Sequence, residues 1–167
     1  MKTVIVLAAH GAPPTDYPPQ RVGMLMALEF APRRITHLGF LRAKRAALDR
    51  EVRTWRRTGE NDPYKNGVEQ LAAQIAKHAG LPVIVGYNEF CAPTIAEAID
   101  HAAQDNATQV IVATTMLTRG GEHSEIEIRA LVEAAQARHP QVRIVYAWPP
   151  DGERVAQLFA AEVKRFV

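Results

Sequence analysis

The sequence predicts an α/β fold built around a four-stranded parallel sheet. Four short runs rich in Val, Ile and Leu are typical of strands that are covered on both faces, as they are in parallel sheets. Amphipathic helical patterns lie between these runs, so strands and helices alternate along the chain. The predicted strands are Thr3–Ala9, Pro82–Asn88, Gln109–Thr115 and Arg143–Trp148. The length of 167 residues fits one domain, and we predict a single domain over residues 1–167.

Apolar residues at helical spacing predict the helices of the second half of the chain. One stripe is formed by Ile95, Ile99 and Ala102, and another by Ile128, Leu131, Val132 and Ala135. A last helix is expected over Asp151–Phe166. We expect it to bury its apolar residues, namely Val155, Leu158, Phe159 and Val163.

The first connection is too long for a simple crossover, because 72 residues separate Ala9 from Pro82. We predict helices near Gln20–Phe30 and Thr36–Arg57, before a covering helix at Tyr64–His78. Residues of about 14–63 therefore form a helical insertion after the first strand. Insertions at the ligand-binding end of a sheet commonly form a lid or a specificity wall, and the alternative is a second helical layer packed on the domain.

The charge is unevenly distributed along the chain. The net charge is +2, but Arg33–Arg57 contains nine Lys or Arg against Asp49 and Glu51, a balance of +7 that leaves −5 for the remainder. Such a block favours an anionic partner, whereas the simpler interpretation is a solvated helix face. Nucleic acid is not favoured, because the block matches no recognised module and does not alternate aromatic with basic residues along its length.

Several classes of protein are excluded or disfavoured. Cys91 is the only cysteine, which excludes an intrachain disulfide and a cysteine-rich zinc site. No apolar run approaches the roughly 18 residues of a membrane span, so we expect no membrane partner and a cytoplasmic location. The motifs Gly-x-Gly-x-x-Gly, Gly-x-x-x-x-Gly-Lys-Ser/Thr and Gly-x-Ser-x-Gly are missing, so neither a nucleotide cofactor nor acyl transfer is expected.

Two histidines follow predicted strands and indicate a metal site. His10 directly follows the first strand, and His123 lies in the loop after the third. Ligands of open α/β sheets bind outside the carboxyl ends of the strands, so both imidazoles are expected at one edge. Two imidazoles suit a transition-metal ion. Glu89 follows the second strand and reaches the same edge.

Neighbouring residues have predicted supporting roles. Gly11 lacks a side chain, which leaves room for the backbone to turn and for a ligand. Ser124 and Glu127 match the Ser-x-x-Glu capping box of a helix start. The same spacing places His123 and Glu127 four residues apart on one flank of a helix, so Glu127 is either a helix cap or a support for His123.

These segments together resemble the sirohydrochlorin chelatases of the CbiX/SirB type, which are relatives of ferrochelatase. The resemblance is carried by Ala8-Ala9-His10-Gly11, by Asn88-Glu89-Phe90 with the following Ala92–Ala98, and by Gly121-x-His123-x-x-x-Glu127-Ile128. It implies a three-layer flavodoxin-like (chelatase-like) domain with a four-stranded parallel sheet. The chain departs from the family pattern at Ala12, where serine is frequent, and at Glu127, where aspartate is expected.

The resemblance also implies a function. His10 and His123 are expected to bind the metal, with Glu89 as a neighbouring acid, and all three are candidate catalytic residues. The expected enzyme is a lyase-class chelatase that inserts cobalt(II) into sirohydrochlorin in cobalamin-type tetrapyrrole biosynthesis. Iron(II) or nickel(II) with a related tetrapyrrole, or a noncatalytic metal or tetrapyrrole carrier, are the alternatives. Arg42, Arg45 and Arg53 are expected to bind the substrate carboxylates. Small members of this family assemble as homodimers, so the resemblance also implies a homodimer here.

Overall fold

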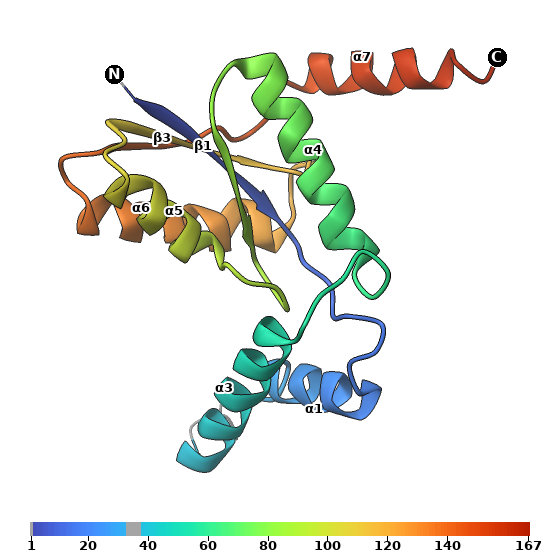
Figure 1. Cartoon of the computed structure of the whole chain (residues 1–167), viewed down its shortest axis with the longest axis vertical. Coiled ribbons are helices and arrows are strands. Elements are labelled where there is room, and N and C mark those ends of the chain that lie inside the picture. The colour runs from blue at the N-terminus through green and yellow to red at the C-terminus, as the bar shows by residue number, and fades with distance from the viewer. Residues whose placement is uncertain (1, 33–37) are drawn as a thin grey trace.

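A parallel sheet forms the centre of the molecule in the computed structural model, which describes residues 2–32 and 38–167 (Figure 1). Within these residues the sheet contains four strands in the order β2-β1-β3-β4. They are β1 (Thr3–Ala9), β2 (Val83–Tyr87), β3 (Gln109–Thr114) and β4 (Arg143–Tyr146). The predicted α/β fold with four parallel strands is confirmed, and the strand ends differ from the predicted ones by no more than two residues.

The strand register aligns the carboxyl ends of β1, β2 and β3. Ile5 of β1 pairs with Val83 on one side and with Ile111 on the other. Ala9 and Ala8, at the end of β1, pair with Tyr87 and Thr114. The loops that follow these three strands therefore leave the sheet at the same edge.

One face of the sheet is covered by α5 (Ile95–Gln104) and α6 (Ile128–Arg138). The predicted stripes of these helices pack on alternate residues of the strands, among them Val6, Val110 and Val112, in one buried cluster. Helix α5 starts at a capping box in which Thr94 and Glu97 bind each other's backbone amides. This box has the sequence signature Thr-x-x-Glu.

The opposite face is covered over β1 and β2 by α4 (Pro63–Ala79). Val68 and Ala72 of α4 pack on Leu7 and Tyr87. Asp62 caps the start of α4 by accepting a hydrogen bond from the amide of Lys65, and Gly80 ends the helix in the left-handed conformation. These signals agree with the predicted helix Tyr64–His78.

The insertion forms a helical arm, which we define as α1 (Pro19–Glu29) and α3 (Gly39–Thr54) (Figure 1). The two helices pack through Leu25, Leu48 and Val52. Residues 33–37 lie outside the described part, including Arg33, Arg34 and the predicted helix start at Thr36. Phe90, in the loop after β2, belongs to the same cluster, so the arm is anchored on the loop that also carries Glu89.

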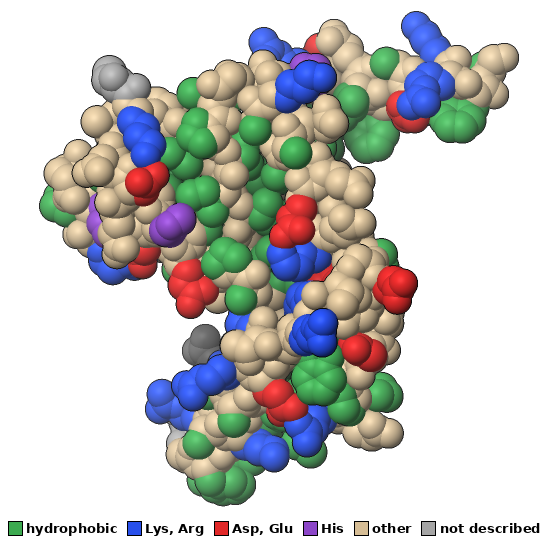
Figure 2. All heavy atoms as spheres, in the orientation of Figure 1, with side chains coloured by type: hydrophobic (Ala, Val, Ile, Leu, Met, Phe, Trp, Pro, Cys, Tyr) green, Lys and Arg blue, Asp and Glu red, His purple; other side chains and the backbone are tan. Residues whose placement is uncertain are grey.

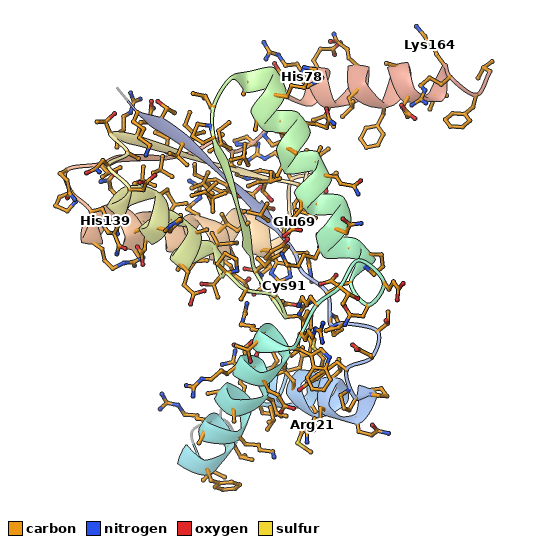
Figure 3. All side chains as sticks on the ribbon, in the orientation of Figure 1. Arg21, Glu69, His78, Cys91, His139 and Lys164 are labelled. Carbon is orange, nitrogen blue, oxygen red and sulfur yellow. The ribbon has the colours of Figure 1, made fainter. Side chains whose placement is uncertain are left out.

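An ion pair buried at the base of the arm fixes its position. Arg57 pairs with Asp62, and both side chains are almost fully buried. The Arg57 guanidinium also donates to the carbonyl oxygens of Ala12 and Phe90. Figure 3 places Cys91 at this junction between arm and sheet. Because a buried charge is costly unless it is paired, this network holds the loops after β1 and β2 against the arm.

The predicted burial of the last helix is wrong. Helix α7 (Gly152–Val163) projects away from the sheet, and its side chains Leu158, Phe159 and Val163 are 59%, 58% and 60% exposed. Its spacing marks an apolar face correctly but does not determine which surface covers that face. Pro149 and Pro150 stiffen the connection from β4 and hold the helix away from the sheet. Among the helices in the described ranges, none is long and apolar enough to cross a membrane.

Candidate metal centre

Three potential metal ligands come together at the carboxyl edge of the sheet. His10 follows β1, Glu89 follows β2, and His123 follows β3. One ligand atom from each of the three residues lies within 4.8 Å of the others. The structure therefore brings together the two histidines and the acid that the strand ends singled out.

Gly11 allows the loops after β1 and β2 to approach closely. It has a φ of +99°, and a Cβ atom at this position would lie 1.9 Å from the carbonyl oxygen of Glu89. The Glu89 amide donates to the carbonyl oxygen of His10 at 2.8 Å. Gly11 is itself buried, so the structure gives it a packing role between these two loops, and its predicted contact with substrate stays a prediction. Only glycine permits this juxtaposition of His10 and Glu89.

His123 lies on a π-helical turn, His123–Glu127, that leads into α6. The predicted capping box is wrong, because Ser124 is inside this turn and is buried. Its hydroxyl donates to the carbonyl oxygen of Gly121 at 3.2 Å, and Tyr146 donates to the carbonyl oxygen of Ser124 at 2.9 Å. The helical turn begins one residue before Ser124, which removes the need for a serine cap.

Glu127 instead orients His123. Nδ1 of His123 lies 2.6 Å from Oε2 of Glu127, and because a carboxylate only accepts, Nδ1 carries the proton. Asn88 Nδ2 donates to the same oxygen at 2.9 Å. This leaves the lone pair of a neutral His123 on Nε2, the atom that lies 4.0 Å from Oε1 of Glu89. The sequence placed Asn88 at the end of the second strand and in the motif Asn88-Glu89-Phe90, but it did not predict this contact with Glu127.

The same contacts set the charges of the pair. The hydrogen bond to Glu127 raises the pKa of His123 above its ordinary value. Burial alone raises the pKa of Glu127, but the hydrogen bonds from Asn88 and His123 outweigh burial and hold that pKa below its ordinary value. Glu127 is therefore ionised at neutral pH, and its charge makes the His123 imidazole more basic.

The geometry suits an ion that is held in an open site. Two donors that each lie about 2.1 Å from one ion are separated by up to about 4 Å, close to the 4.0 Å between His123 Nε2 and Glu89 Oε1. The rings of His10 and His123 meet edge to face, with centroids 5.0 Å apart. Two imidazoles and one carboxylate suit Fe²⁺, Co²⁺, Ni²⁺ or Zn²⁺, and three protein ligands leave coordination positions free.

A cavity of about 400 Å³ lies beside these residues, between the helical arm and α6. Its apolar lining includes Leu25, Met26 and Leu131. Its polar lining is formed by Glu29, Arg45, Asp49, Arg53, Asn88, Glu89 and Glu127. One wall of the cavity thus comes from the insertion and the other from the sheet domain.

The family match can be placed on this geometry. The sequence model of the CbiX family matches residues 57–165, about two thirds of the chain. The chain belongs to the CbiX family. The matched region contains Glu89, His123 and Glu127, whereas His10 and the helical arm precede it.

Individual proteins are also similar to this CbiX-family chain. The sirohydrochlorin cobaltochelatase of Priestia megaterium is 33% identical over 94 residues, which are 54% of this chain and 30% of that relative. This chain thus matches less than one third of the length of that curated relative. A solved structure described as a cobalamin (vitamin B12) biosynthesis CbiX protein, from Marinobacter aquaeolei VT8, superposes with a TM-score of 0.53 at 17% identity, over 98% of each chain. The sirohydrochlorin chelatase SirB from Bacillus subtilis subspecies spizizenii, solved in complex with cobalt, has a TM-score of 0.49 at 16% identity and covers 87% of this chain and 42% of that chain.

In this CbiX-family chain the three arginines expected to bind substrate differ in position. Arg45 lines the cavity and pairs with Glu29. Arg42 lines an adjoining hollow between α1 and α3, together with Leu28 and Ala43. Arg53 also reaches the cavity, but its guanidinium binds Asp49 and donates to the carbonyl oxygens of Cys91 and Asn88 at 2.7 and 3.0 Å. Arg53 therefore holds the loop that carries Asn88 and Glu89.

Proposed function

We propose that this chain is a metal chelatase that inserts a divalent metal ion into sirohydrochlorin. Cobalt(II) is the metal that we propose first. One observation carries the proposal above all others. In a chain of the CbiX family, His10, Glu89 and His123 converge at the sheet edge next to a cavity. The name of the Priestia megaterium relative supports the same substrate and the same metal.

The three converging residues suit temporary metal binding. A chelatase must hold the ion firmly enough to present it and loosely enough to release it to four pyrrole nitrogens. His10, His123 and Glu89 supply three ligands at most, so the ion keeps open positions at which the macrocycle can bind it. The side chains of His10 and Glu89 are only partly buried, which leaves them accessible to a substrate.

The same residues account for the protons of the reaction. Entry of the divalent ion into the macrocycle displaces two pyrrole N–H protons, so the net charge is conserved when both protons leave. The His123 imidazole freed by metal release can accept a proton, and Glu89 offers a carboxylate 4.0 Å from His123. Glu127 favours this transfer because it stabilises a protonated His123.

The helical arm forms the second wall of the substrate site in this proposal. Residues 14–63 are then an insertion within one domain, and its Leu25 and Met26 contact the macrocycle while Arg42 and Arg45 face its carboxylates. A homodimer remains the expected assembly.

Metal insertion with single-histidine variants tests this function. The purified chain is mixed with sirohydrochlorin and with cobalt(II), iron(II) or nickel(II), and insertion is followed by the change in visible absorption. His10→Ala and His123→Ala are each expected to lower the insertion rate by at least an order of magnitude, because each removes a ligand. Cobalt(II) is expected to give the highest rate.

His101→Ala is the matched control, since His101 is exposed on α5 away from the metal centre. It is expected to retain the full rate, and all three variants are expected to keep the circular dichroism spectrum of the unmodified chain. Tight metal or tetrapyrrole binding without turnover for any of the three metals would instead identify a carrier. Near-normal rates in either His10→Ala or His123→Ala would remove that residue from the site.

A further inference from the structure

The two faces of the sheet are covered unequally within residues 2–32 and 38–167. Helices α5 and α6 both pack on one face, whereas α4 is the helix that packs on the other, over β1 and β2. On the α4 side, β3 and β4 present the alternate residues Ile111, Ala113 and Val145, because Val110, Val112 and Ile144 point into the α5–α6 cluster. Ile111, Ala113 and Val145 are partly exposed. We call these three residues the open sheet face.

The flank of α4 extends the open sheet face. A shallow groove between α4 and the end of β3 is lined by Tyr64, Val68, Leu71 and Thr115. Leu71 and Tyr64 are exposed large apolar side chains. The open sheet face and this groove together form an apolar surface bounded on one side by α4, which is the place where a second helix packs in a doubly wound fold.

Helix α7 has the matching unpaired surface. Val155, Leu158, Phe159, Val163 and Phe166 follow the spacing of one apolar stripe. The last four of these are all more than half exposed, and Figure 2 shows green side chains along one edge of α7. The helix has 12 residues, about 18 Å, which is comparable to the length of the six-residue strand β3.

The connection to α7 directs the helix away from its own sheet. The Trp148 amide donates to the carbonyl oxygen of Tyr146 at 2.9 Å, and the two rings stack with centroids 6.0 Å apart. Pro149 and Pro150 follow and restrict the backbone further. Asp151 then caps the start of α7 by accepting hydrogen bonds from the amides of Glu153 and Arg154. Each of these contacts fixes the direction in which the chain leaves β4.

We propose that two copies of this chain exchange their α7 helices, so that α7 of each copy packs on the open sheet face of the other. Each chain provides one apolar stripe on α7 and one open sheet face. A reciprocal exchange about a two-fold axis therefore covers both stripes and both faces. Phe159 and Phe166 each bring about 150–250 Å² of surface. The four phenylalanines of two copies thus supply about 600–1,000 Å² when fully covered. The sheet surface that they cover buries a similar area, so the two contacts together approach the roughly 1,200–2,000 Å² of specific interfaces. The proposal does not depend on the metal centre.

Light scattering on the whole chain gives the first test. The unmodified chain is expected at twice 18.5 kDa, and the double variant Phe159→Asp, Val163→Asp at 18.5 kDa. Both positions are exposed, so the variant is expected to keep the circular dichroism spectrum and the metal affinity of the unmodified chain. Phe40→Asp is the matched control, because Phe40 is also more than half exposed but lies on α3, and this variant is expected to remain a dimer.

Cross-linking distinguishes exchange from a helix that folds back on its own sheet. Two single variants, Phe159→Cys and Ala113→Cys, are mixed and treated with a short bis-maleimide. Because Cys91 is buried, the unmodified chain is expected not to react. Exchange predicts a covalent heterodimer of the two variants. Three outcomes overturn the proposal: an 18.5 kDa unmodified chain, a dimer that survives Phe159→Asp, Val163→Asp, or a chain carrying both cysteines that links only within itself.

Discussion

At the scale of single residues, the candidate metal centre includes a carboxylate that supports one of the proposed ligands, His123. Glu127 accepts from Nδ1 of His123 and from Asn88, and so selects the tautomer that leaves Nε2 free. Such support of a histidine ligand typically changes metal affinity by 10–100-fold. It also raises the pKa of His123, which makes protons stronger competitors of the metal.

Glu127→Gln is expected to weaken cobalt(II) binding by about 10–100-fold at pH 8. The amide oxygen can still accept from Nδ1, but the negative charge is lost, so the pKa of His123 falls toward its ordinary value. Metal binding requires the neutral form of the His123 imidazole. The unmodified chain therefore loses metal as the pH falls through the raised pKa, and the variant does so at a lower pH. Calorimetric titration of cobalt(II) between pH 5 and 8 measures both effects.

Glu125→Gln controls for a change of charge on the same turn. Glu125 accepts from the amide of Gly120 at 3.3 Å and from Arg119, away from the two histidine rings. It is expected to leave cobalt(II) affinity and its pH dependence nearly unchanged. Equal affinities for Glu127→Gln and the unmodified chain would show that Glu127 has no part in metal binding.

At the scale of elements, α5 and α6 are joined by a charged contact as well as by their apolar faces. Asp100 of α5 accepts from Arg138 and His139 at the end of α6, each at 2.8 Å. Burial raises the pKa of Asp100, but these two hydrogen bonds outweigh burial and hold the pKa below its ordinary value. Cations at a helix C-terminus are also favourable, so the contact suits the end of α6.

Asp100→Asn is expected to lower the free energy of unfolding by about 1 kcal/mol at pH 7, because the contact is partly exposed to solvent. A lowered pKa in the folded state stabilises the fold above the ordinary carboxyl value of about 4 and loses this effect as the pH falls through the folded-state pKa. The difference between variant and unmodified chain is thus expected to shrink in acid. Urea unfolding at pH 7 and pH 3 measures it. Asp105→Asn, at an exposed pair with Lys2, is expected to change stability far less at both pH values.

The elements also show what the sequence could and could not predict. Strands β1 to β4 were predictable because continuous β-branched runs have few alternatives in a parallel sheet. The convergence of His10, Glu89 and His123 followed from their positions after strands. The role of Arg53 had no sequence signal, because it binds backbone carbonyl groups 35 and 38 residues away. The predicted burial of α7 was wrong, because an apolar stripe indicates which face of a helix is apolar but not which surface covers that face.

At the scale of the whole molecule, the cavity joins the metal centre to the helical arm. The segment Arg33–Arg57 has a net charge of +7, but this charge does not make the arm side of the cavity uniformly positive. Arg45 pairs with Glu29, and Arg53 pairs with Asp49. A test of substrate binding leaves Arg53 unchanged, because its substitution would disturb the loop that carries Asn88 and Glu89. Arg42 and Arg45 remain the candidates on the arm for contact with substrate carboxylates.

Arg42→Glu with Arg45→Glu is expected to raise the apparent Michaelis constant for sirohydrochlorin by about tenfold at low salt, because two exposed attractions become repulsions. The increase is expected to shrink at high salt, which screens exposed charges. Cobalt(II) affinity is expected to stay unchanged, since the proposed metal ligands lie on the sheet edge. Lys44→Glu with Arg50→Glu makes the same charge change on the same helix outside the lining of both hollows. If the two double variants share one Michaelis constant at every ionic strength, the arm acts only through its net charge, and the cavity wall is not the substrate site.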